Sequence, residues 1–136
     1  MEREQQRLIN ADIIVFEYPV FWYSWPSLLH RYVEDVFRHG FSHGSTGHKL
    51  KGKKLVISFT TGAPESVYTK DGMGITIDDL QLPAIATCNL TQMEYAGAVY
   101  TCGVSYGNRT DTAKIEQQKT ACSKHARQLI ELIESV

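Results

Sequence analysis

A continuous apolar run leads into a proline and a cluster of aromatic residues near the start of this chain. Ile13 to Phe16 is apolar at every position, which is typical of a strand buried on both faces of a parallel sheet. Pro19 has no N–H to donate, so it predicts the end of that strand. Aromatic side chains then follow at Phe21, Trp22, Tyr23 and Trp25. Ligands of open α/β sheets bind outside the carboxyl ends of the strands, so these rings predict either a floor for a flat ligand or a hydrophobic plug over the sheet end.

Short apolar strands alternate with helical periodicity along the rest of the chain, which predicts βαβ units and a parallel sheet. We expect strands at residues 13–16, 55–60 and 98–104, and helices at residues 2–10, from 27 to about 40, from 76 onward and from 110 to the C-terminus. The helix after Pro26 places Leu28, Tyr32 and Val36 on one apolar stripe. Pro83 lies inside the third helical pattern and predicts a kink or a late start. The glycine- and lysine-rich residues 40–54 predict a mobile surface loop. We expect residues 1–136 to form one α/β domain.

The composition excludes several classes of function. A net charge of -1 gives no electrostatic basis for binding nucleic acid or an anionic membrane. No apolar run reaches the ~18 residues of a membrane-spanning helix, and the charged N-terminus lacks the apolar centre of a signal peptide. The chain has 3 cysteines and no C-x-x-C pair, which disfavours a disulfide framework and a structural zinc site. A cytoplasmic protein with buried or half-buried thiols is the expectation.

A second polar loop follows the strand at residues 55–60, with the sequence Thr60-Thr61-Gly62-Ala63. Right-handed crossovers place consecutive parallel strands side by side, so this loop and the aromatic loop should line one crevice. The aromatic loop offers rings and backbone N–H groups, whereas the second loop offers hydroxyls and a glycine that allows close approach of the backbone. Together the two loops suit a planar heteroaromatic ligand with several edge acceptors, such as a flavin.

These segments resemble the flavodoxin-like NAD(P)H:quinone oxidoreductases, a family that includes quinone reductases and ancillary subunits of glutathione-gated potassium efflux systems. The matching stretches are PVFWYSWPSLLHRYVEDVFRHGF and GKKLVISFTTGAPESVY, and the similarity runs from about Ala11 to Gly97. The resemblance implies a flavodoxin-like three-layer sandwich around a parallel sheet. It also implies ping-pong transfer of a hydride from NAD(P)H through FMN or FAD to a quinone or a similar acceptor, in a homodimer.

The resemblance also implicates individual residues, because family members hold the isoalloxazine ring largely through backbone groups of these loops. The implied cofactor-binding residues are Pro19, Val20, Phe21, Trp22 and Tyr23 in the first loop, and Thr60, Thr61, Gly62 and Ala63 in the second. Tyr68 matches a tyrosine that faces the flavin and assists charge movement in hydride transfer, so it is a candidate for both binding and catalysis. Gly74 stands where the best-known members have a histidine, and Ala63 replaces the second glycine of their T-T-G-G loop.

The family begins with a β-α-β unit whose first loop binds the flavin phosphate, and no such unit precedes Glu2 here. What remains is the last three strands with their helices, so Ile13 to Phe16 should form an exposed apolar edge. We expect the chain to be a truncated product or fragment, or to complete its sheet through another chain.

Three other groups of residues have ordinary explanations. The histidines at positions 39, 43 and 48 predict solvated loop residues rather than a metal site, and the lysines at 49, 51, 53 and 54 predict a solvated face more than a site for nicotinamide phosphates. Asp78 and Asp79 predict charges at a helix start. The leading function is a flavin-dependent quinone reductase. The alternatives are a non-catalytic regulatory subunit associated with a membrane transporter for potassium efflux, and a degenerate fragment that binds no flavin.

Overall fold

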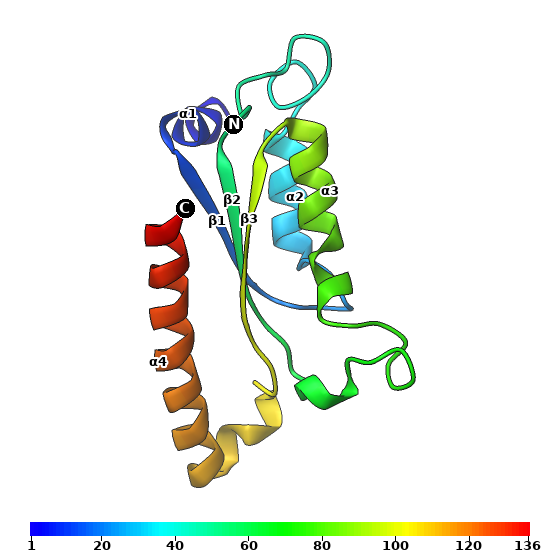
Figure 1. Cartoon of the computed structure of the whole chain (residues 1–136), viewed down its shortest axis with the longest axis vertical. Coiled ribbons are helices and arrows are strands. Elements are labelled where there is room, and N and C mark those ends of the chain that lie inside the picture. Colours follow the sequence, from blue (N-terminus) through cyan, green and yellow to red (C-terminus); the bar gives the residue numbers. More distant parts are fainter.

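The computed structural model describes residues 1–136 and contains one sheet of three parallel strands, in the order β1-β2-β3 (Figure 1). The strands are β1 (Ile13–Pro19), β2 (Lys54–Thr60) and β3 (Glu94–Thr101). The α-helices are α1 (Glu2–Asn10), α2 (Ser27–Val36), α3 (Leu82–Thr91) and α4 (Thr112–Ser135), and short 3-10 turns span Glu65–Val67, Asp78–Gln81 and Tyr106–Thr110. The prediction of an α/β chain with three parallel strands is confirmed.

The helices form layers on the two faces of the sheet. Figure 1 shows α2 and α3 on one face, α4 alone on the other, and α1 beside the amino ends of the strands. The core fills the space between the sheet and the α2 and α3 layer, where 17 buried residues form one hydrophobic cluster. Tyr18, Phe59 and Tyr100 stack across the three strands in this layer, with ring centroids 5.9 and 5.5 Å apart. Most of the buried apolar area therefore lies on one side of the sheet.

The burial pattern of β1 differs from the prediction that this strand is buried on both faces of the sheet. In β1 buried and exposed residues alternate, because only one face is covered, and Val15 is 37% exposed on the other. The strand buried on both faces is β2, whose residues Leu55 to Phe59 are all buried. Because β1 is an edge strand, its outer side is unpaired in this structure, as predicted from the sequence.

Several element boundaries differ from those predicted. The α2 helix ends at Val36 rather than near residue 40, and Leu28 is 80% exposed instead of facing the core. The α3 helix starts late, at Leu82, as Pro83 predicted. The third strand begins at residue 94 rather than 98, because Gln92 takes a left-handed conformation (φ 60) and turns the chain directly from α3 into β3. A bulge beside Gly97 then hides the alternation that marks a strand in the sequence.

Residues 40–54 lie largely at the surface, as predicted, but are anchored by buried residues. Ser42 and Leu50 are fully buried. Lys53 Nζ donates to the carbonyl oxygens of Ile9 at 2.7 Å and Ala11 at 2.6 Å, so it satisfies carbonyls at the carboxyl end of α1. This lysine and Lys54 lie at the amino ends of the strands, which is the opposite end of the sheet from the two predicted flavin loops.

The cysteines differ in exposure. Cys88 is buried and burial raises its pKa to about 11, Cys102 is half-buried, and Cys122 is exposed. The expectation of small buried hydrophobes is therefore wrong for Cys122. No helix combines the length and the apolar character needed to cross a bilayer.

Candidate functional site

The two predicted ligand loops lie side by side at the carboxyl edge of the sheet. Pro19 is in register with Thr60, and the Val20 N–H donates to the Thr60 carbonyl oxygen at 2.8 Å. The structure therefore brings together the segments 19–23 and 60–63 that the sequence implicated, because β1 and β2 are neighbours and end at the same level.

The aromatic loop is a tight hairpin that presents its rings to solvent. Phe21 and Ser24 exchange two backbone hydrogen bonds of 3.1 Å each, with Trp22 and Tyr23 as the two turn residues. Both turn residues adopt left-handed backbone conformations, with φ of 48° and 64°. Turns of this kind favour Asn and Gly, and the conformation is costly for large side chains. The exposed fractions are 58% for Phe21, 92% for Trp22 and 50% for Tyr23, so strained backbone holds apolar rings outside the core.

The second loop is tied to the segment that follows β3. The Thr61 N–H donates to the Thr101 carbonyl oxygen at 3.0 Å, and the Val104 N–H donates to the Thr61 carbonyl oxygen at 2.9 Å. The Gly103 N–H donates to the Ala63 carbonyl oxygen at 2.9 Å, and Thr61 Oγ1 donates to the same oxygen at 2.8 Å. These bonds fix the loop as a rigid platform beside the aromatic hairpin.

Four backbone N–H groups in the two loops donate to no protein group. They belong to Trp22, Tyr23, Gly62 and Ala63. A Cβ added to Gly62 would meet nothing within 4 Å, so open space lies over this part of the platform. Free donors beside exposed aromatic rings match the needs of a flat heterocycle with acceptor atoms along its edge. The residues present therefore fit the isoalloxazine part of a flavin.

Tyr68 and Trp25 lie deeper than the loops. Tyr68 is only 8% exposed and belongs to the hydrophobic cluster, so its contact with a flavin stays a prediction. Trp25 is 6% exposed and meets Phe16 edge to face at 5.7 Å, so it packs in the core and does not form part of the exposed aromatic surface. Trp25 Nε1 and the Tyr18 hydroxyl are buried without a hydrogen-bond partner. Burial raises the pKa of Tyr18 to about 12, and the nearby Trp25 indole offsets this only in part, so the phenol stays neutral at physiological pH.

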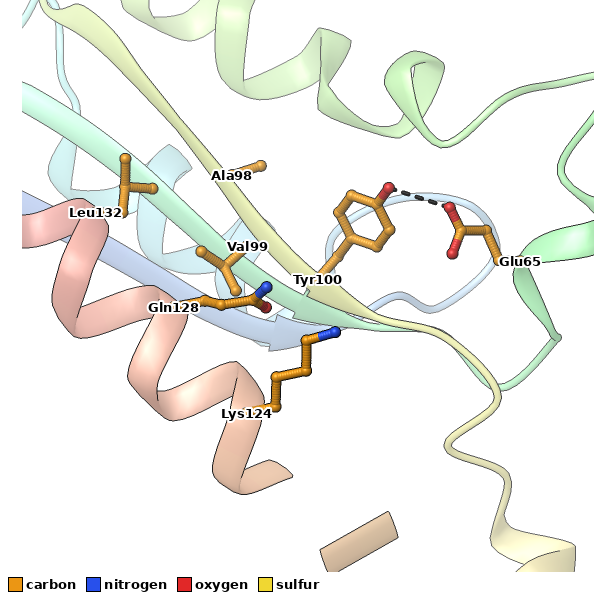
Figure 2. A pocket seen from close by; sticks show the side chains of 7 residues that line it. All are labelled: Glu65, Ala98, Val99, Tyr100, Lys124, Gln128 and Leu132. Carbon is orange, nitrogen blue, oxygen red and sulfur yellow. Dashed lines mark hydrogen bonds between the residues drawn. The ribbon is translucent and has the colours of Figure 1, made fainter. Parts of the chain in front are cut away.

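A groove that the sequence did not predict runs along the outer edge of β3 (Figure 2). Its volume is about 470 Å³, and its lining residues are Glu65, Ala98, Val99, Tyr100, Lys124, Gln128 and Leu132. The Tyr100 hydroxyl donates to Glu65 Oε1 at 3.2 Å, and burial together with this carboxylate raises the pKa of Tyr100. The groove could not be predicted because its residues come from three separate segments. Glu65, a charged residue two positions after the second loop, was the one available signal.

The family assignment follows from comparison with known proteins. The family model described as a flavodoxin-like fold matches residues 1–126. The chain belongs to this flavodoxin-like family. Its fold, three parallel strands between helical layers, is the flavodoxin-like arrangement that the sequence resemblance implied.

Relatives and solved structures of the family carry names that bear on the site. The chain is 38% identical over 112 residues to the uncharacterized NAD(P)H oxidoreductase YrkL of Bacillus subtilis, covering 82% of this chain and 64% of the relative. The general stress protein 14 of Treponema denticola, solved in complex with FMN, is 25% identical with a TM-score of 0.79, covering 96% of this chain and 72% of that one. An NADPH-quinone reductase from P. pentosaceus is 29% identical with a TM-score of 0.71, covering 85% and 67%. The chain thus spans slightly less than two thirds of the length of YrkL.

Proposed function

We propose that this flavodoxin-like chain binds FMN at the carboxyl edge of its sheet and acts in NAD(P)H:quinone oxidoreduction. The observation that carries the proposal is the set of free N–H groups of Trp22, Tyr23, Gly62 and Ala63 beside the exposed rings of the hairpin. The FMN complex of the similar stress protein and the names of the similar NAD(P)H and NADPH-quinone enzymes support it.

Each part of the site has a separate task in this proposal. The rings of Phe21 and Trp22 would pack against apolar parts of a bound flavin, and the four N–H groups would donate hydrogen bonds to its acceptor atoms and stabilise negative charge there. Tyr68, buried beside the loops, would assist charge movement. A flavin bound there would supply the two-electron chemistry of ping-pong oxidoreduction between NAD(P)H and a quinone.

Gly62→Ala provides a sharp test, because the added methyl group would point into the open space where the ligand is proposed to lie. We expect the variant to fold like the wild type and to bind FMN roughly tenfold or more weakly. Quenching of FMN fluorescence measures the binding, and chemical denaturation measures the fold. Gly107→Ala is the matched control, since its Cβ meets only Ser105 Oγ at 3.6 Å and it lies outside both loops.

Measurements on the wild-type protein test the choice of cofactor and the proposed activity. If the protein quenches FAD fluorescence more strongly than FMN fluorescence, the choice of FMN is wrong. If it quenches the fluorescence of neither flavin, the proposal is wrong. Consumption of NADH or NADPH with a soluble quinone, after FMN has been added, tests the oxidoreductase activity and identifies the nicotinamide donor.

An exposed apolar patch favours a second candidate, a flavin-binding subunit that works through protein contacts. Phe21, Trp22, Tyr23 and Leu28 are each at least half exposed and lie within eight residues of one another. Such a surface suits either the homodimer expected for a quinone reductase or docking on a transporter. FMN binding without any NAD(P)H oxidation would favour the second candidate.

A further inference from the structure

We propose that His125 of α4 is a positioning residue that fixes the Thr60–Ala63 platform, a role that rests on the function proposed above. Its imidazole lies between two hydroxyl groups of the sheet. Ser58 Oγ is 2.7 Å from Nε2, and Thr101 Oγ1 is 2.8 Å from Nδ1. Ser58 belongs to β2 and Thr101 to β3, so one side chain bridges two neighbouring strands.

The bridge acts next to the platform. Ser58 lies two residues before Thr60 on β2, and Thr101 is in register with Thr60. The Thr101 carbonyl oxygen accepts the Thr61 N–H at 3.0 Å, and Val104, three residues further, donates to the Thr61 carbonyl oxygen. Holding Thr101 in place through its hydroxyl therefore also holds the backbone that supports Thr61.

His125 is also the main polar attachment of α4. None of the 24 residues of this helix is fully buried. The two bonds of His125 are the only side-chain hydrogen bonds from α4 to the sheet, because the other side-chain bonds of the helix are local to it or to its cap. Apolar contacts alone would leave the helix free to shift along the sheet, whereas two directional bonds define its position.

A serine hydrogen-bonded to a histidine also occurs in nucleophilic catalysis, but this pair is unsuited to it. The Ser58 side chain is fully buried, so no substrate carbonyl could reach its Oγ. The far ring nitrogen faces the Thr101 hydroxyl rather than a carboxylate that would stabilise an imidazolium. A neutral imidazole has one donor and one acceptor, and each hydroxyl can complement either of them. The geometry is that of a structural bridge.

Two substitutions of His125 distinguish the effect of its hydrogen bonds from the effect of its side-chain volume. His125→Phe keeps a ring but removes both nitrogens, whereas His125→Gln keeps one donor and one acceptor. Leu129→Ala, one turn along the same helix, is the matched control because it weakens apolar packing in the same pocket without removing a hydrogen bond to either hydroxyl.

The first readout is amide hydrogen exchange at Thr61 and Val104 in protein without flavin. We expect roughly tenfold faster exchange in His125→Phe than in Leu129→Ala, compared at equal stability, and near wild-type exchange in His125→Gln. The second readout is FMN affinity, which should fall roughly tenfold in His125→Phe and be largely restored in His125→Gln.

Equal protection of these two amides in His125→Phe and Leu129→Ala would overturn the positioning role, as would failure of His125→Gln to restore protection. If the wild-type protein binds no FMN, the proposed function fails, yet the exchange measurement still decides the role of His125. If FMN binds and the amides respond but the FMN affinity does not change, the exchange result supports His125 as the residue that fixes the platform, and the expected effect on FMN affinity is wrong.

Discussion

At the scale of single residues, the backbone of the aromatic hairpin is the least expected feature. Trp22 and Tyr23 occupy positions that Asn and Gly would fill with less strain, so replacing them should stabilise the protein. We expect the double variant Trp22→Asn, Tyr23→Gly to raise the free energy of unfolding by about 1–2 kcal/mol while abolishing FMN binding. Urea denaturation and FMN fluorescence measure the two effects.

Ser24→Gly is the control for this double variant, because Ser24 does not adopt a positive φ and gains nothing from glycine. It should lower the free energy of unfolding by about 0.5–1 kcal/mol. A double variant that is less stable than the wild type would show that the rings stabilise the fold more than their backbone conformation strains it.

At the scale of elements, one carboxylate links two parts of the connection between β2 and α3. Asp79 Oδ2 accepts from Lys70 Nζ at 2.6 Å and from the Thr76 N–H at 2.8 Å, which closes the loop that begins with Tyr68. The Lys70 hydrogen bond, followed by the Thr76 N–H, lowers the pKa of Asp79 from 3.8 to about 2. Because the folded-state pKa is depressed, this stabilisation is complete above about pH 4 and is lost as the pH falls toward 2.

Asp79→Asn should therefore reduce the loss of thermal stability that the wild type shows on acidification from about pH 5 to pH 2. Thermal unfolding followed by circular dichroism across this range measures it. Asp78→Asn is the control, since Asp78 accepts only from Gln81 Nε2 at 3.1 Å, and it should retain the wild-type pH dependence. Identical curves for the wild type and Asp79→Asn would remove the loop contact from the explanation of acid sensitivity.

The sequence predicted the features that depend on neighbouring residues and missed those that depend on residues far apart in the chain. The apolar runs located β1 and β2, and the paired loops at their ends located the candidate site, because both signals lie within a few residues. Leu28 was misplaced because it lies in the first turn of α2, whereas Val36 of the same stripe is buried as predicted. The bridge of His125 escaped prediction because Ser58 and His125 are 67 residues apart. The only sequence signal for this bridge was Ser58, a single polar residue within the apolar run of β2.

At the scale of the whole molecule, we expect the open edge of β1 to govern association. Val15 is 37% exposed on the face of the sheet opposite the main core, and the backbone of β1 has no partner beyond β2. Unpaired edges of this kind template further pairing, and a lysine is a common natural protection against it. We expect the wild type to self-associate at rising concentration and Val15→Lys to shift the protein toward monomer, with light scattering as the measurement.

Glu17→Lys is the control for charge alone, since Glu17 is exposed further along the same face of β1 but is not apolar. A wild type that stays monomeric, with slow amide exchange from Ile13 to Phe16, would contradict an open pairing edge.

The contrast between the two tryptophans gives this protein a pair of built-in optical reporters. Trp22 is 92% exposed and Trp25 is 6% exposed, and the sequence contains no others. Iodide should quench the red-shifted emission of the first and spare the blue-shifted emission of the second. One fluorescence spectrum can therefore follow occupation of the hairpin and integrity of the core at the same time, without any label.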